Sequence, residues 1–582
     1  MTFRAPVRDI AFALAAVGGS DLARRSFPDL DDDTVQAILT AAGAFCEEQL
    51  APLNRIGDTH GARYENGRVT VAPGFADAYR AFAEGGWNSL SADPEHGGQG
   101  LPKALEAGVF EMVQAANMAF GLCPMLTQSA IEALAHVGTE RQKRVYLPRL
   151  VSGEWTGTMN LTEPQAGTDL AALTTRAEPD GAGGYRLNGQ KIFITWGDHD
   201  AADNIVHLVL ARLPDAPPGV KGISLFLTPK RVVNEDGTLG GLNGLRPASI
   251  EHKLGIHGSP TCVMLFEGAK AEMVGQPGEG LANMFLMMNA ARLQVGVQGV
   301  AIGERAWQQA MAFALERRQG RSAWTGETSA RIWDHPDVRL MLALTKAKIE
   351  AARGICLMTA VLADEARLAE TEDERAAAKA RQELLTPIAK AWSTDIGVEA
   401  ASIGVQVHGG MGFIEETGAA QHYRDARIAP IYEGTNGVQA LDLVGRKAPM
   451  ADGAVVRALA ADILTTAEAL TAAEGLAPVG KRLAEGVLAL ERATDWLLEH
   501  RGPEGLAGAT AYLRLAGSVV GGWVLGRQAL LAKDGTDPWL SGKAKLARIY
   551  ADRVLTLAAG EAAAAMAGDR DLAALEPEAL AG

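Results

Sequence analysis

The chain has 582 residues and a formal net charge of −15, with 47% hydrophobic and 21% charged residues. This composition is typical of a globular enzyme of about four compact units, at roughly 150 residues per unit. The acidic balance argues against a nucleic-acid partner, because a surface that follows phosphates needs clustered lysine and arginine. The four cysteines are dispersed, with no CxxC pair and no metal-ligand spacing, which predicts free thiols in a reducing compartment and no metal site.

The N-terminus combines basic residues with a short apolar run. Arg4 and Arg8 precede the apolar run from Ile10 to Val17, which loosely resembles a secretion signal. Pro6 and Asp9 interrupt that pattern, so a short amphipathic helix packed on the body is the favoured interpretation. No apolar run approaches the ~20 residues that a membrane span needs. We therefore expect a cytoplasmic protein without a membrane span.

The first 155 residues are predicted to be mainly helical. Apolar residues recur at helical spacing in DDTVQAILTAAGAFCEEQLAPL, and the acidic cluster at its start suits a helix N-terminus. A loop rich in helix breakers follows later, from Ser91 to Pro102.

The pattern changes to strands between about Trp155 and Val274. Alternating or β-branched segments stand there between Gly, Pro and Asn-Gly breaks, which predicts a compact β unit. Within GYRLNGQKIFIT, the pair Asn188-Gly189 separates two strand-like runs and predicts a β-hairpin.

Long helices are predicted to return after about Gly280. The last stretch, 450–582, is rich in Ala and Leu and is broken near Gly502-Pro503 and at DGTDPWLSG. It holds 13 Lys plus Arg against 17 Asp plus Glu, so it is not a basic arm. Strands and helices do not alternate throughout, and neither a GxGxxG after a strand nor a Walker A loop occurs, which excludes a Rossmann or P-loop nucleotide site.

Four short stretches carry residues suited to chemistry. TGTMNLTEPQAGTDL, from Thr156 to Leu170, offers hydroxyl and main-chain donors to a planar polar ring, although a plain strand-turn-strand would look the same. KIFITWG ends a strand about 25 residues later, and VQVHGGMGF is a Gly-rich break between helices. The fourth, APIYEGTNGVQ, places the single acid Glu433 in a stretch suited to burial or a tight turn, where a lone carboxylate is costly to desolvate.

These stretches together resemble the acyl-CoA dehydrogenase family. MNLTEPQAGTD, ADPEHGGQGL, HKLGIHGSPT, QVHGGMGF and RDARIAPIYEGTNGVQ match family segments in the expected order over most of the chain. The resemblance implies a mainly α fold with a central β-barrel: an N-terminal helical domain (1–155), a middle β-barrel (156–278), a helical bundle (279–448) and an extra C-terminal helical domain (449–582). The N-terminal APVRDIAFALAAVG and the extension resemble the long bacterial branch, which includes 3-methylmercaptopropionyl-CoA and fatty acyl-CoA dehydrogenases.

The resemblance implies FAD as cofactor. The segment from Met159 to Thr168 would run along the flavin, and the segment around Phe193 would cover its other side. The family often has Trp at the position of Phe193, so the side chain that would cover the flavin is smaller here. Whether Trp196 compensates for this stays open. Arg317 would reach the pyrophosphate from a neighbouring subunit, or would pair with acids of its own helix. The residues implied for the FAD site are Met159, Leu161, Thr162, Gly167, Thr168, Phe193, Ile194, Thr195, Arg317, Gln319, Gln406, Gly409, Gly410, Thr435 and Asn436.

Glu433 matches the catalytic base of the family. Gly434 would let the backbone turn close to the thioester, and Tyr432 would keep water out; both are implied to contact substrate. Arg292 stands where the family contacts the CoA moiety, with a structural salt bridge as the alternative. The position before it carries the base in some relatives, and here it is Ala291, which cannot take a proton. An Asp at position 433 would have indicated nitroalkane oxidase, and no acid there a flavin hydroxylase.

The implied reaction is conversion of an acyl-CoA to the trans-2-enoyl-CoA, with electron-transferring flavoprotein as acceptor and a homodimer as assembly. An acyl-CoA oxidase, which passes electrons to oxygen, is the closest alternative. A DNA-associated flavoprotein is a rival from another class, but it needs a basic C-terminal surface that this chain lacks. Short straight-chain, methylthio-substituted and longer acyl groups all stay open.

Overall fold

The computed structural model describes residues 3–581. The N-terminal part is helical, as expected, and a π-helical turn at Cys46–Leu50 joins α3 to α4. Asp31 caps α3 by accepting a hydrogen bond from the main-chain N–H of Thr34 at 2.8 Å. The helices are α1 (Val7–Ala16), α2 (Gly19–Ser26), α3 (Asp32–Phe45), α4 (Ala51–His60), α5 (Phe75–Glu84), α6 (Lys103–Ala116), α7 (Met118–Val137) and α8 (Glu140–Val151), with a short hairpin of β1 (Arg63–Glu65) and β2 (Arg68–Thr70).

The middle part is a β-barrel. β7 pairs with both β6 and β11, so the order β11-β5-β4-β6-β7 returns to β11 and closes a ring, while β3 and β10 extend it. Parallel β4 and β6 meet through one pair, Arg176 and Arg212. The strands are β3 (Trp155–Asn160), β4 (Arg176–Pro179), β5 (Tyr185–Thr195), β6 (Asn204–Arg212), β7 (Ile223–Pro229), β8 (Arg231–Val233), β9 (Leu239–Leu242), β10 (Leu245–Ile250) and β11 (Thr261–Val274).

The hairpin predicted at Asn188-Gly189 is wrong. β5 runs unbroken through both residues and pairs with β11, with a bulge opposite Asn188. Gly189 serves a close approach instead of a turn, because a Cβ there would lie 2.5 Å from Oγ1 of Thr175 beside it. The Asn188 side chain accepts from the N–H of Gly268 at 2.8 Å and so covers the bulge.

Three long helices form the centre of the molecule. α9 (Gly280–Glu316), α10 (Pro336–Leu368) and α11 (Glu372–His408) run up, down and up, so the C-terminal ends of α9 and α11 meet. α12 (Ala419–Ala426) and α13 (Asn436–Asp442) follow.

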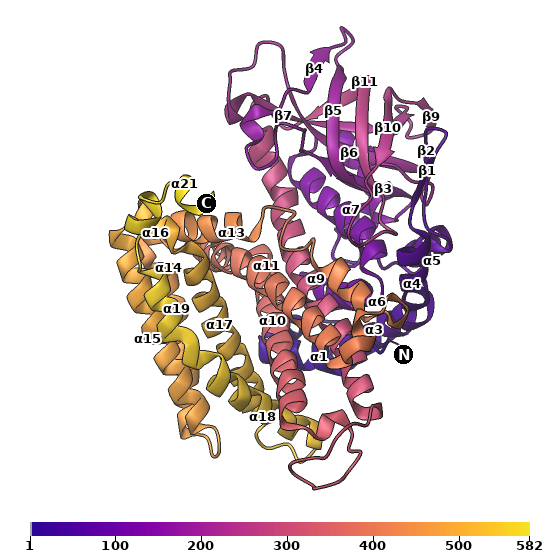
Figure 1. Ribbon diagram of the computed structural model, residues 1–582. Helices are drawn as coiled ribbons and strands as arrows, with labels where there is room; N and C mark the ends of the chain where they lie inside the picture. Colours follow the sequence, from indigo (N-terminus) through magenta and orange to yellow (C-terminus); the bar gives the residue numbers. More distant parts are fainter. Residues whose placement is uncertain (1–2, 582) are drawn as a thin grey trace.

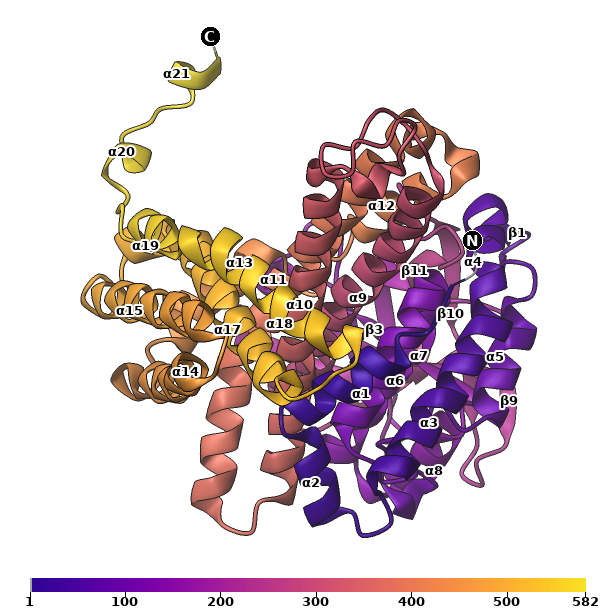
Figure 2. The same cartoon turned by 90° about the horizontal axis from the view of Figure 1, so that it is seen from below.

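The C-terminal extension packs on the side of α10 and α11 away from most of the N-terminal domain (Figures 1 and 2). Its helices are α14 (Ala454–Ala472), α15 (Ala477–Glu499), α16 (Pro503–Ala507), α17 (Ala509–Ala532), α18 (Pro538–Arg553), α19 (Ala558–Ala565), α20 (Arg570–Ala573) and α21 (Glu578–Ala581). The predicted α class with a central β-barrel and an extra C-terminal helical region is thus confirmed.

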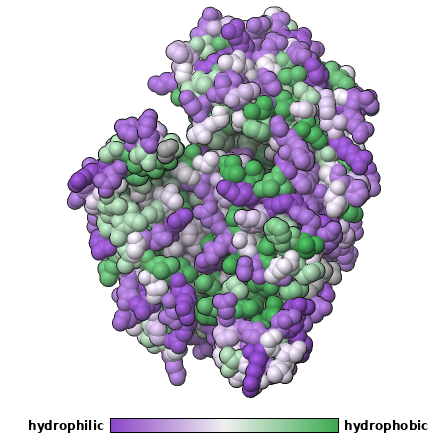
Figure 3. Space-filling model, viewed as in Figure 1, coloured by the Kyte–Doolittle hydropathy of each residue, from purple (hydrophilic) through white to green (hydrophobic). Residues whose placement is uncertain are grey.

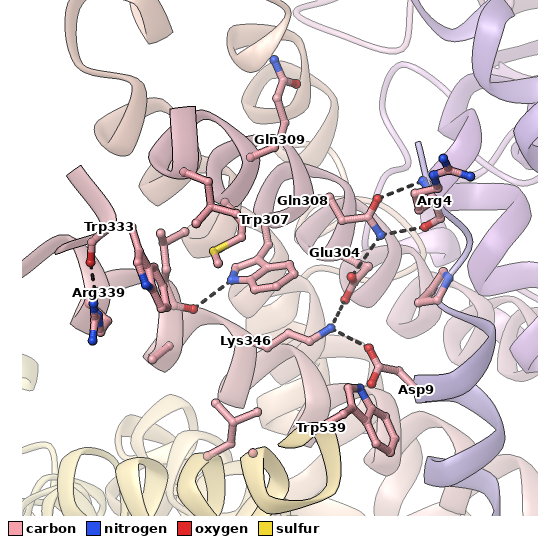
Figure 4. A pocket seen from close by; sticks show the side chains of 18 of the residues that line it. Arg4, Asp9, Glu304, Trp307, Gln308, Gln309, Trp333, Arg339, Lys346 and Trp539 are labelled. Atoms are coloured by element: carbon pink, nitrogen blue, oxygen red, sulfur yellow. Dashed lines mark hydrogen bonds and ion pairs between the residues drawn. The ribbon is translucent and has the colours of Figure 1, made fainter. Parts of the chain in front are cut away.

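Buried charges join the two ends of the chain to the bundle. Asp9 of α1 pairs with Lys346 of α10 at 2.9 Å and with Lys543 of α18 at 2.8 Å. Lys346 also reaches Glu304 of α9 at 2.8 Å (Figure 4). Deeper, the fully buried Arg353 is surrounded by three acids, which are Glu111, Glu304 and Glu350. A cavity of about 840 Å³ between α1, α9, α10 and α18 is lined in part by this cluster, and none of the residues singled out for chemistry lines it.

Within the part of the chain that the structure describes, two helices are long and apolar enough to cross a membrane, α7 and α17. Both are core helices here, since 83% and 78% of their most apolar windows are buried inside the protein. α1 is packed as expected, with Ile10 and Ala13 fully buried.

Candidate active site

Glu433 lies in a tight turn between α12 and α13. Its own φ is 56° and that of Gly434 is 82°, so two successive residues adopt the left-handed region. A side chain at position 434 would be strained, and its Cβ would lie 2.7 Å from Nε2 of Gln439. Thr435 ends the turn by capping α13, with its hydroxyl accepting from the N–H of Val438 at 3.2 Å. A non-glycine residue held at positive φ carries a cost that functional sites often accept.

The surroundings of Glu433 raise its affinity for a proton. Burial raises the pKa of its carboxyl to about 7, against the opposing effect of the cations Arg292 and Lys390. The Nε–H of Arg292 donates to the Glu433 carbonyl at 3.4 Å, and its Nη1–H donates to Asn289. Arg292 is 6% exposed and makes no ion pair within the described residues, so the salt-bridge alternative has no support. Ala291, on the neighbouring position of α9, is fully buried.

Asn436 connects this turn to α11. Its side-chain carbonyl accepts from Nζ of Lys390 at 2.9 Å, and its side-chain N–H donates to Asp395 at 2.7 Å and to the Ala391 carbonyl at 3.1 Å. These contacts turn the Asn436 amide toward α11 and fix where α13 begins. Asn436 therefore positions the turn in the isolated chain, and a role toward FAD stays a prediction for it and for Thr435.

The Thr156–Leu170 stretch follows the edge of the barrel. Thr158 donates to the Thr195 carbonyl at 2.7 Å, which aligns β3 with the end of β5. Met159 is buried, Leu161 and Thr162 are half-buried, and Gly167 and Thr168 are exposed. The segment is held from inside by Glu163, whose carboxylate pairs with Nζ of Lys191 at 2.8 Å. Burial raises the pKa of Glu163, but Lys191 and hydrogen bonds from Thr174 and Thr175 bring it to about 2.

Phe193 and Trp196 have opposite orientations. Phe193 is 58% exposed and Trp196 is 1% exposed, although both have positive φ, 60° and 50°. The indole N–H of Trp196 donates to the Ala119 carbonyl at 3.2 Å inside the N-terminal domain. Trp196 therefore points away from the surface on which Phe193 lies and does not compensate for the smaller side chain of Phe193. Ile194 is buried and Thr195 is half-buried. The surface is hollowed where the β domain meets the bundle, with hydrophobic residues around the hollow (Figure 3).

The remaining predicted FAD residues lie at the other end of the bundle. Phe313 of α9 stacks on His408 of α11 with ring centroids 4.5 Å apart, so the residues that follow both helices are neighbours. Arg317 comes 25 positions after Arg292, about 37 Å along the helix at ~1.5 Å per residue. Five predicted residues are brought together there and all are exposed: Arg317, Gln319, Gln406, Gly409 and Gly410.

Arg317 and His408, both at this end of the bundle, differ in their contacts. Arg317 forms no ion pair among the described residues, which removes the alternative that acids of its own helix hold it. His408 is packed and hydrogen-bonded, 6% exposed, with Nδ1 2.7 Å from the Gly404 carbonyl. One chain thus separates its predicted FAD residues into two distant groups.

Sequence reasoning missed two residues near the Glu433 turn, Lys390 and Gln298. Lys390 is fully buried in α11 and has no carboxylate within ion-pair distance among residues 3–581, and burial lowers its pKa to about 7. Gln298 of α9 accepts a short hydrogen bond from the Tyr432 hydroxyl. A lysine inside the apolar run TPIAKAW was a signal that could have been noticed. Gln298 had no such signal, because its contact joins residues 134 positions apart.

The chain matches four family models in succession. They are the acyl-CoA dehydrogenase N-terminal domain (32–154), middle domain (158–269) and C-terminal domain (278–448), and the acetyl-CoA dehydrogenase C-terminal-like domain (459–576). A 3-methylmercaptopropionyl-CoA dehydrogenase of Ruegeria pomeroyi is 46% identical over 96% of this chain and 97% of its own length. The chain belongs to the acyl-CoA dehydrogenase family. It is an oxidoreductase of the long form, with the extra C-terminal domain.

Other relatives in the acyl-CoA dehydrogenase family agree with this. The broad-specificity linear acyl-CoA dehydrogenase FadE5 of Mycobacterium tuberculosis is 32% identical over 95% of this chain and 96% of its own length. An acyl-CoA dehydrogenase of Bacillus anthracis, described as complexed with FAD, has the same fold, with a TM-score of 0.71, 22% identity and coverage of 94% and 90%. The expected FAD cofactor is confirmed for the family. The two full-length relatives are described as dehydrogenases, so the oxidase alternative gains no support.

Proposed function

We propose that this enzyme removes the α and β hydrogens of an acyl-CoA thioester, with Glu433 as the base and FAD as the hydride acceptor. The observation that carries the proposal is the Glu433 turn, in which burial raises the pKa of the carboxyl to about 7. A base poised near neutral pH suits proton transfer from a weak carbon acid. Ala291, at the alternative base position, leaves Glu433 as the acid for this role.

Besides a base, the reaction needs a hydrogen-bond donor for the thioester carbonyl, and the main chain of the turn offers one. Among the described residues, no main-chain or side-chain acceptor receives the N–H of Glu433, whereas the neighbouring N–H of Tyr432 donates to Ile428. This free N–H is suited to the thioester carbonyl, where negative charge develops as the α-proton leaves. Arg292, held by the Glu433 carbonyl, supports the turn and offers a buried cation to the CoA moiety.

The residues present fit FAD in two parts. The exposed Phe193 ring and the Met159–Thr168 segment would hold the isoalloxazine, which when bound accepts the hydride from the β-carbon. The group around Arg317 would hold a pyrophosphate, because a guanidinium pairs with phosphate in a bidentate manner. Since about 37 Å separates Arg317 from Arg292, that group serves the FAD of a second chain.

A homodimer accounts for this separation. Phe413, Met411 and Ile414, next to Gly409 and Gly410, are 85%, 52% and 47% exposed. Exposed apolar side chains next to the group around Arg317 suit an interface between two copies of this chain. We place the enzyme in the cytoplasm, with electron-transferring flavoprotein as acceptor.

The proposal is tested by mixing the FAD-loaded enzyme with acyl-CoAs without oxygen and following flavin absorbance. Bleaching by 3-methylmercaptopropionyl-CoA, the substrate named for the Ruegeria relative, or by fatty acyl-CoAs is the expected result. No bleaching by any acyl-CoA would refute the function. Fast peroxide formation in aerated buffer would assign the enzyme as an oxidase.

Activity is expected to rise with pH through about 7, as Glu433 ionises, and Lys390→Met should move this rise upward. A positive charge favours the carboxylate, so removing it raises the pKa of Glu433, by roughly one unit. The other charged groups near Lys390 and Glu433 are Arg292 and Asp395. The measurement is the rate of flavin reduction between pH 5.5 and 9; an unchanged midpoint would show that Lys390 has no electrostatic effect on the base. The control is Lys379→Met, at an exposed lysine of the same helix α11.

Arg317→Ala is expected to weaken FAD retention while leaving the chain folded. The guanidinium is exposed and unpaired in one chain, so its loss removes a phosphate contact of roughly 1.5–3 kcal/mol and little else. The flavin-to-protein ratio after gel filtration measures this, with the neighbouring Arg318→Ala as control. An unchanged ratio would remove Arg317 from the FAD site.

A further inference from the structure

The cavity between α1, α9, α10 and α18 is lined mainly by apolar side chains. Figure 4 shows Trp307 of α9, Trp333 just before α10 and Trp539 of α18 around it. The indole N–H of Trp307 donates to the Leu342 carbonyl at 2.9 Å, so this ring needs no polar partner from the cavity. The volume of about 840 Å³ lies within the roughly 300–1,000 Å³ that is typical of small-molecule sites.

The cavity extends along two helices. Its lining residues run from Glu304 to Leu315 on α9 and from Trp539 to Ile549 on α18. At ~1.5 Å per residue, each of these runs is about 15 Å long. Aliphatic side chains such as Met311 of α9 and Leu546 of α18 belong to the lining. An extended alkyl chain contacts such a cavity along its length, whereas a compact ring leaves part of it empty.

Several of the cations on the lining already have carboxylate partners. Lys346 and Lys543 share Asp9, with Nζ to carboxylate distances of 2.9 and 2.8 Å. Lys346 also reaches Glu304 at 2.8 Å, and Arg339 pairs with an acid just before α10 at 3.1 Å. These four groups are therefore not available as unpaired charges for a ligand.

Arg305 of α9 is different. It lines the cavity, but within residues 3–581 its guanidinium forms neither an ion pair nor a hydrogen bond, and its Nε is buried. Its guanidinium carbon lies 5.2 Å from the centre of the Phe3 ring. Burial lowers the pKa of Arg305 to about 10, with no nearby acid to oppose the effect. Because a charge withdrawn from water without a counter-ion is costly, a bound anion would stabilise it.

We propose that this cavity is a binding site, separate from the catalytic site, for an amphipathic anion in which an extended alkyl chain ends in a carboxylate that pairs with Arg305. A carboxylate accepts two parallel hydrogen bonds from a guanidinium, which are stronger than bonds between neutral groups. The tryptophan rings and aliphatic side chains bury the alkyl chain, at about 25 cal/mol per Å² of apolar surface. Lys545, an exposed lining lysine with no ion pair in the described chain, adds a second positive charge.

The test compares an anionic ligand with a neutral one of the same chain length. Decanoate and 1-decanol are titrated separately into the FAD-loaded enzyme in a calorimeter. We expect decanoate to bind at one site per chain, about tenfold or more tightly than 1-decanol, because only decanoate supplies the charge that Arg305 lacks. No binding of decanoate, or equal affinity for both ligands, overturns the proposal.

Arg305→Met removes the charge and keeps an apolar stem. The affinity for decanoate should fall by about tenfold or more, while that for 1-decanol should stay the same. Arg527→Met is the matched control, because Arg527 of α17 is also half-buried and lies outside the cavity, with its guanidinium carbon 5.5 Å from the centre of the Trp523 ring. This control should bind decanoate as the wild type does.

Gly542→Leu tests the space instead of the charge. Gly542 lines the cavity from α18, and a Cβ there would lie in open space, so leucine occupies the cavity without disturbing the helix. We expect it to weaken the binding of both ligands by about tenfold or more. Gly560→Leu is the control, since a Cβ at Gly560 of α19 also meets open space and Gly560 does not line the cavity.

The outcomes keep the cavity site distinct from the proposed dehydrogenation. Decanoate binding that is unchanged in both Arg305→Met and Gly542→Leu would place the ligand elsewhere, such as in the acyl part of the catalytic site, and would overturn the proposal. If Arg305→Met does not fold, Gly542→Leu decides by itself. Flavin bleaching by acyl-CoAs is followed on the same preparations, and its absence refutes the proposed function without affecting the cavity site.

Discussion

Glu433→Gln should abolish nearly all turnover while leaving FAD and acyl-CoA bound. Glutamine keeps the size of the side chain and the left-handed turn, but it cannot accept the α-proton. Loss of a general base lowers the rate by about 10²–10⁴-fold. The measurement is the first-order rate of flavin bleaching after anaerobic mixing, beside a titration of acyl-CoA binding.

The control for this experiment is Glu416→Gln, an exposed acid in the segment before α12. It should bleach at the wild-type rate. If Glu433→Gln retained a rate within about tenfold of wild type, Glu433 would not be the base. Glu433→Asp should fall between the two, because the shorter side chain keeps the proton acceptor but draws it back from the substrate.

Arg353→Met should cause the largest loss of stability among single changes outside the site. Arg353 is fully buried and bonds Glu111 at 2.7 Å and Glu304 at 3.0 Å. Its removal leaves Glu111 without a cation, whereas Glu304 keeps Lys346. Removing one partner of a buried ion pair costs about 3–5 kcal/mol. The shift in the unfolding transition in urea, followed by circular dichroism, measures the loss.

An exposed ion pair provides the comparison for Arg353. Arg375, with a side chain 48% exposed, pairs with Glu372 on the surface of α11, and Arg375→Met should change stability by less than about 1 kcal/mol. Equal effects of the two changes would mean that the buried cluster contributes no more than a surface pair. Adding Glu111→Gln to Arg353→Met should restore part of the loss, since Glu111 is the buried carboxylate that the first change leaves without a cation.

Much of this enzyme could be predicted from local patterns. Helical spacing and breakers located the helices, and β-branched runs located the barrel, because both depend on neighbours along the chain. Glu433 was found in the same way, as a lone acid within an apolar turn motif. The Asn188-Gly189 hairpin failed because the glycine is required by Thr175, a residue brought near by strand pairing.

The sequence by itself thus determined the fold class and the family, and it singled out Glu433 as the predicted base. The tertiary structure alone decided that Trp196 is turned inward, that Lys390 and Arg292 lie near Glu433, and that Gln298 hydrogen-bonds to Tyr432. It also separated Arg317 from Arg292 by most of the length of α9. The physical reason is that burial, charge pairing and unpaired donors depend on residues from different helices, and no local pattern records which helices meet.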